Sequence, residues 1–105
     1  MKGFGGGMQA LMRQANQMQG RIKKLQEELA TREFEGSAGG GGVKVKVTGD
    51  NLMVSVTIQA DLASDVEMLQ DLVKIATNDA IATAKKVSQE EMAKITGGMG
   101  MPGMF

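Results

Sequence analysis

The sequence contains no cysteine and no histidine, and these two absences exclude several kinds of chemistry. Without cysteine there is no disulfide and no thiolate nucleophile. Without histidine the commonest general base is missing, and zinc loses its usual nitrogen ligand as well. Carboxylates remain, but Glu27 and Glu28 are adjacent, as are Glu90 and Glu91, and adjacent helical side chains point about 100° apart rather than toward one substrate atom. We therefore predict a protein that is not an enzyme and has no metal or other cofactor.

Aromatic residues are also scarce, with three Phe, no Tyr and no Trp among 105 residues. This length allows one domain at most. A domain of this size buries only about 65% of the surface that its unfolded chain exposes, so its stability alone is marginal. We therefore expect the chain to form a homo-oligomer.

Long apolar runs are absent as well, since no run approaches 18 residues. Residues 1–7 are rich in glycine and lack the apolar segment of a signal peptide. The sequence thus predicts no membrane partner, and the lack of cysteine fits a reducing cytosol. We expect residues 1–7 to be a flexible leader and residues 8–96 to form the folded domain.

A long amphipathic helix is predicted over residues 8–32. Its apolar residues recur in alternating steps of three and four, at the a and d positions of three heptads. These residues are Met8, Leu11, Ala15, Met18, Ile22, Leu25 and Leu29. A stripe this narrow is typical of a helix that lies against another helix, either the second helix of the same chain or a second copy. We favour a second copy, with a dimeric coiled-coil seam made by Met8, Leu11, Met18, Ile22, Leu25 and Leu29.

The opposite face of this helix is basic, although the chain as a whole has no net charge. Residues 1–32 contain six basic and two acidic residues, whereas residues 60–105 contain four basic and seven acidic ones. Arg13, Lys23 and Lys24 occupy outward heptad positions, and Arg21 flanks the stripe. Such side chains neutralise phosphates without reading bases, and the alternative is an ordinary solvated face. No aromatic residues are interleaved with them, which argues against a site that stacks single strands.

Three short strands are predicted after the helix. Residues 33–38 alternate charged with uncharged side chains, and residues 43–47 place three Val on one face and two Lys on the other. Residues 52–58 alternate again, with one apolar face. The four glycines at 39–42 lack the Gly-Lys-Ser/Thr ending of a phosphate loop and precede a strand, so we interpret them as a flexible connection. Residues 48–51 have the composition of a hairpin turn.

A second helix is predicted from Ser64, which has capping-box spacing with Glu67, to Thr96, before a stop at Gly97. Its broad, alanine-rich face is suited to close packing on a sheet. The predicted fold is therefore α+β, in the order α-β-β-β-α, with a three-stranded antiparallel sheet whose apolar face the second helix covers. Residues 97–105, rich in Gly and Met, are predicted to be a disordered tail.

The ordered set of these features resembles the YbaB/EbfC family of small bacterial nucleoid-associated proteins over residues 8–98. The resemblance is carried by the start of the heptad helix, the segment from the first to the second strand, the hairpin glycine, a short stretch of the second helix and its glycine stop. These are residues 8–15, residues 36–45, Gly49, residues 76–80 and residues 97–98, followed by the Met/Gly tail. The resemblance implies an α-β-β-β-α fold and an intertwined homodimer with projecting helices. It also implies a location at the nucleoid and binding of double-stranded DNA with little sequence preference. Arg13, Arg21, Lys23 and Lys24 are the positions that would contact the DNA.

Two functional hypotheses follow from the sequence. The first is a homodimeric nucleoid-associated protein that binds DNA mainly through phosphates and affects gene expression, nucleoid organisation or DNA repair. The second is a non-enzymatic interaction module that docks a recombination or repair protein through the seam or the Met-rich tail. Salt-dependent binding of duplex DNA would distinguish the first from the second.

Overall fold

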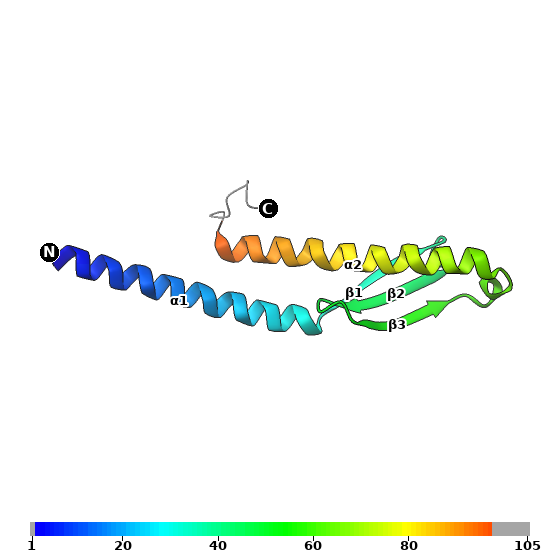
Figure 1. The fold of residues 1–105 in the computed structure, drawn as a ribbon, viewed down its shortest axis with the longest axis horizontal. Coiled ribbons are helices and arrows are strands. Elements are labelled where there is room, and N and C mark those ends of the chain that lie inside the picture. The colour runs from blue at the N-terminus through cyan, green and yellow to red at the C-terminus, as the bar shows by residue number, and fades with distance from the viewer. Residues whose placement is uncertain (1, 98–105) are drawn as a thin grey trace.

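The computed structural model describes residues 2–97, with side chains from residue 7 onward. Two long helices, α1 (Lys2–Thr31) and α2 (Val66–Thr96), enclose three strands in sequence: β1 (Glu33–Ala38), β2 (Val43–Thr48) and β3 (Met53–Ile58). A short 3-10 helix, η1 (Ala60–Ser64), leads from β3 to α2. The predicted α-β-β-β-α order is therefore confirmed (Figure 1). Within residues 2–97, neither long helix combines the length and the apolar character that crossing a bilayer requires.

The sheet is antiparallel, with the strand order β1-β2-β3. Val43, Val45 and Val47 on β2 are fully buried, while the intervening Lys44 and Lys46 are exposed. This alternation confirms the prediction for residues 43–47. The same period on β1 buries Phe34, Gly36 and Ala38 and exposes the residues between them, because successive side chains of a strand point to opposite faces.

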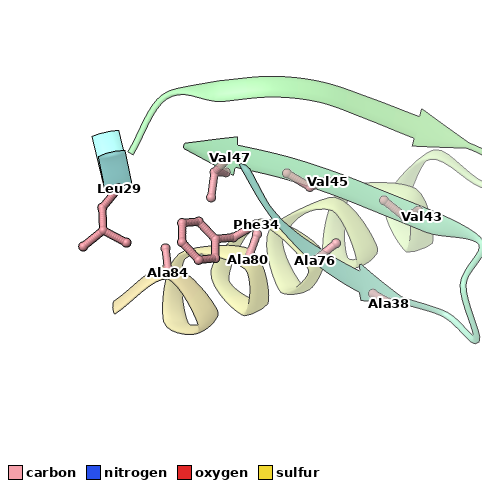
Figure 2. Close-up of a cluster of buried hydrophobic side chains, with 9 residues drawn as sticks. All are labelled: Leu29, Phe34, Ala38, Val43, Val45, Val47, Ala76, Ala80 and Ala84. Atoms are coloured by element: carbon pink, nitrogen blue, oxygen red, sulfur yellow. The ribbon is translucent and has the colours of Figure 1, made fainter. Parts of the chain in front are cut away.

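Helix α2 lies across β1 and β2 and approaches them closely through small residues. Gly36 sits against the backbone of Ala76 and Ala80, and a Cβ atom added at Gly36 would clash with both. Figure 2 shows the Phe34 ring between Val47 of β2 and Ala84 of α2. The buried core consists of Leu29, Phe34, Ala38, Val43, Val45, Val47, Ala76, Ala80 and Ala84. Alanines on α2 and a glycine on β1 thus allow one helix to close a core that contains a single aromatic ring.

The predicted cover of the whole apolar sheet face by α2 is wrong for β3. Val54, Val56 and Ile58 are 47%, 40% and 39% exposed. Ile58 lies opposite Val43, and Val56 opposite Val45, so these side chains share the face that α2 covers elsewhere. A helix about 10 Å wide spans roughly two strands that lie about 4.8 Å apart, and β3 is the third strand.

Both ends of α2 are capped, though not at the predicted N-terminal residue. Asp65 is the N-cap, and its carboxylate accepts a hydrogen bond from the Met68 N–H at 3.0 Å. The Ser64 hydroxyl instead donates to the Asp61 carbonyl within η1, because the 3-10 turn engages it before the helix begins. At the other end Gly97 adopts a left-handed conformation with φ 61°, which confirms the predicted stop. The rest of the predicted tail, residues 98–105, lies outside the described residues.

Helix α1 begins at Lys2, whereas the sequence predicts a flexible leader over residues 1–7 and a helix from Met8. Glycine weakens a helix by about 1 kcal/mol per residue but, unlike proline, does not interrupt its hydrogen bonds, so a glycine-rich first turn is possible. The other end of α1 is fixed to the sheet, because the Gly49 N–H donates to the Leu29 carbonyl at 3.0 Å. The amino-terminal part of α1 extends well past the end of α2 (Figure 1).

Candidate nucleic-acid interface

The apolar stripe of α1 is divided into a buried and an exposed half. Leu29 is 6% exposed within the core of its own chain, and Leu25 packs against that core. Met18 and Ile22 are half-buried, whereas Met8 and Leu11 are 63% and 66% exposed. The carboxyl-terminal half of the predicted seam therefore has a partner within one chain. Contact with a second copy stays a prediction for the amino-terminal half.

The outer face of α1 presents the predicted basic residues to solvent. Arg13, Lys23 and Lys24 are exposed. Arg13 and Lys24 are eleven residues apart, which is about three turns and about 17 Å, so they lie almost in line along the helix. The basic stretch ends at Glu27 and Glu28, which are also exposed. Duplex DNA carries one charge per about 1.7 Å of its axis, so a basic line of this length faces many phosphates.

Arg21 is placed differently from the other three basic residues. It lines an open hollow of about 350 Å³ between the middle of α1 and the carboxyl-terminal end of α2. The other lining residues are Gln14, Gln17, Met18, Ile95, Thr96 and Gly97. A helix carboxyl terminus carries partial negative charge, so Arg21 is favourably placed beside the last turn of α2. It therefore lies beside the line formed by Arg13 and Lys24 rather than on it.

None of these four side chains forms an ion pair with another side chain that the structure describes. Among the side chains of residues 7–97, the single ion pair joins Lys94 and Glu91 on α2, at 3.2 Å. Arg32, just beyond α1, is engaged in a different way, since its guanidinium lies 5.2 Å from the centre of the Phe34 ring. Four basic side chains are therefore available to an external anion: Arg13, Arg21, Lys23 and Lys24. Arg32 instead packs against β1.

The sheet adds a polar outer surface that no motif in the sequence marks for binding. Lys44 and Lys46 face away from α2, and Lys46 lies opposite Glu35 in the register of β1 and β2. Lys44 lies opposite Ser37 and Thr57. Because acidic and hydroxyl side chains are interspersed with the two lysines, this face has less positive charge than the outer face of α1.

Neither a metal site nor a phosphate-binding loop is found among the described residues. Over residues 2–97 there is no group of three or more acidic, His or Cys side chains that could hold a metal ion. The glycines between β1 and β2 form a connecting turn, in which Gly39, Gly40 and Gly41 have φ values of 62°, 65° and 92°. The Gly42 N–H donates to the Gly39 carbonyl at 3.1 Å, which closes this turn. These left-handed conformations favour glycine and lead directly into β2, as expected for a connection between strands.

A family profile decides how this surface is interpreted. The profile of the YbaB/EbfC DNA-binding family matches residues 4–99. The chain belongs to the YbaB/EbfC DNA-binding family. It is 50% identical to a nucleoid-associated protein of Clostridium novyi, over 98% of this chain and 94% of that protein. It is 47% identical to a nucleoid-associated protein of Thermoanaerobacter pseudethanolicus, over 98% of this chain and 96% of that protein.

A solved structure shares the fold. The crystal structure of an uncharacterised protein from Helicobacter pylori superimposes with a TM-score of 0.68, covering 81% of this chain and 91% of that chain. The two sequences are 22% identical, so the likeness concerns the fold alone. The two chains therefore share the arrangement of two long helices around a small sheet.

Proposed function

We propose that this YbaB/EbfC family member is a nucleoid-associated protein that binds double-stranded DNA as a homodimer, mainly through phosphates. It would act in the cytoplasm at the nucleoid, with effects on gene expression, nucleoid organisation or DNA repair. The observation that carries the proposal is the solvent-facing line of Arg13, Lys23 and Lys24, which have no ion-pair partner among the described side chains. The names of the relatives from Clostridium novyi and Thermoanaerobacter pseudethanolicus support the same location.

The chemistry of this surface favours phosphate contacts over base readout. Lys and Arg side chains neutralise phosphates and release condensed counterions, so binding weakens steeply as salt rises. Sequence is read mainly by bidentate contacts from elements that fit the major groove, commonly with Asn, Gln or Arg at fixed positions. The contact groups on the outer face of α1 are Arg and Lys side chains, which are spread over about three turns of the helix. We therefore expect low sequence preference and a large dependence on salt.

The proposed homodimer rests on apolar surface that one chain leaves uncovered. Four large apolar side chains of β3 are exposed in one chain: Met53, Val54, Val56 and Ile58 are 51%, 47%, 40% and 39% exposed. The most continuous surface for such an interface is the uncovered face of β3, which is an edge strand. This face contains Val54, Val56 and Ile58. A second copy would cover it and leave the basic faces of both α1 helices accessible.

Titration of duplex DNA against salt tests the proposal. Binding should weaken as salt rises and should be lost when Arg13, Lys23 and Lys24 are all changed to Glu. If the protein does not bind duplex DNA even at low salt, the result would instead favour the alternative, an interaction module that docks a recombination or repair protein. That alternative has structural support in the exposed half of the α1 stripe.

A further inference from the structure

The free end of α1 carries an apolar patch that no other described residue covers. Met8, Leu11 and Met12 are 63%, 66% and 63% exposed. They lie within two turns of one another, on the N-terminal side of Gln14 and Met18, which line the hollow at the end of α2. Exposed apolar side chains that cluster in this way usually mark a contact surface. The patch is short and apolar, so its occupant must be a short apolar segment that can reach it.

The described part of the chain ends beside the middle of α1, on the C-terminal side of this patch. Gly97 ends α2 in a left-handed conformation, and its N–H donates to the Ala93 carbonyl at 3.1 Å. Gly97 also lines the hollow of about 350 Å³ that Met18 and Arg21 form on α1. The eight residues that follow Gly97 therefore start next to the apolar stripe of α1, on the C-terminal side of its exposed end.

The length of this C-terminal segment, residues 98–105, suffices to reach the patch. Met18 and Met8 are ten residues apart on α1, which corresponds to about 15 Å along the helix. Eight extended residues span up to about 27 Å. Four of the eight residues are apolar and none is charged; the apolar ones are Met99, Met101, Met104 and Phe105. The length and the composition of the segment are therefore compatible with the patch.

We propose that the C-terminal segment docks on the exposed patch formed by Met8, Leu11 and Met12 of the same chain. Methionine is unbranched and flexible, so Met side chains adapt to a shallow surface that would not accommodate a rigid one. A second copy, which the sequence predicts along the whole stripe, is the less suitable occupant of this patch. Leu25 and Leu29 pack within one chain, and the three exposed side chains of the patch fall far short of a standard interface. The segment contains three glycines after Gly97, and ordering glycine is costly, so docking is reversible. Docking would remove part of the apolar surface at this end of α1 from water.

The proposal is independent of DNA binding, because the patch lies on the stripe rather than on the basic face of α1. Its test uses the full chain, in which the absence of cysteine allows a single spin label. Gly103→Cys is labelled with a nitroxide, and the methionine methyl groups are labelled with ¹³C for NMR. The label should broaden the methyl signals of Met8 and Met12 and leave that of Met53, on β3, unchanged. Equal signals for all three methyl groups would overturn the proposal.

Two variants on α1 locate the contact. Leu11→Gln keeps a good helix former but removes the central apolar side chain, so it should abolish the broadening at Met8 and Met12. Ala10→Gln is the matched control, since Ala10 is exposed and lies off the stripe, and it should keep the broadening. Broadening that survives Leu11→Gln would contradict docking on this patch.

Dilution distinguishes a tail of the same chain from that of a neighbour. Doubly labelled protein mixed with an excess of unlabelled protein should keep the broadening, because label and methyl group belong to one chain. Broadening that disappears on this dilution would assign the patch to the tail of a second copy and overturn the same-chain contact. Shortening the chain after Gly97 provides an independent measurement: the Met8 and Met12 methyl signals should shift, and unchanged signals would refute the docking.

Discussion

The Ser37 N–H on β1 donates a hydrogen bond to the Asp79 carboxylate on α2 at 3.1 Å, across 42 positions of sequence. The bond joins an edge strand to the helix that covers it. It satisfies a backbone donor that a strand at the edge of a sheet would otherwise leave to water. Together with the close approach of Gly36 to Ala76 and Ala80, it fixes α2 over β1 and β2 and thereby leaves β3 uncovered.

Asp79→Ala should lower the free energy of unfolding by about 1 kcal/mol, because the acceptor for the Ser37 N–H is lost at a solvent-exposed site. Urea denaturation at a fixed protein concentration measures this change. Asp71→Ala is the matched control, since Asp71 is an exposed acidic residue of the same helix. An equal loss of stability in both variants would contradict a specific role for the bond.

Gly36→Ala should destabilise the fold by roughly 1–3 kcal/mol, because the new methyl group meets the backbone of Ala76 and Ala80 rather than a movable side chain. Gly20→Ala is the contrasting variant. Gly20 lies on α1 with open space around it, so alanine there should raise stability by about 0.5–1 kcal/mol. Thermal and urea unfolding compare the two, and a neutral Gly36→Ala variant would refute the close packing of α2 on β1.

Val56→Lys should disrupt the proposed homodimer, because it places a charge at the centre of the uncovered apolar face of β3. Light scattering should give about twice the 11.1 kDa chain mass for the wild type and a lower mass for the variant. Thr57→Lys is the matched control, since residue 57 points to the opposite face of the same strand. A wild-type mass that equals one chain at all concentrations would exclude the dimer.

The sequence predicts those parts of this fold that depend on local periodicity. The α-β-β-β-α order, the buried valines of β2 and the helix stop at Gly97 follow from side-chain patterns within one element. Relationships between elements do not follow in this way. The width of one helix relative to three strands decides that Val56 stays exposed, and the bond between Ser37 and Asp79 joins residues that no short motif connects.

At the candidate site, too, local spacing predicts features within one helix but not contacts between elements. Heptad spacing correctly places Arg13, Lys23 and Lys24 on the solvent side of α1, because this depends on helix geometry alone. The spacing does not reveal that Leu29 is buried in the core of its own chain, or that Arg21 lies beside the end of α2. Both outcomes depend on where α2 ends relative to α1. The periodic signal identifies a face but not the partner that covers it.

The central claim is that the basic face of α1 binds DNA phosphates, and the salt dependence of duplex binding tests it most directly. The decisive comparison uses two triple variants with the same change in net charge. Arg13→Glu, Lys23→Glu and Lys24→Glu reverse the face of α1, whereas Lys74→Glu, Lys85→Glu and Lys86→Glu reverse three exposed lysines of α2.

Three contacts from each chain of a dimer predict that log affinity falls with log salt with a slope of about −5 for the wild type. The α1 variant should lose binding, and the α2 variant should keep most of it. Binding that is insensitive to salt, or an α1 variant that binds as well as the α2 variant, would contradict the claim.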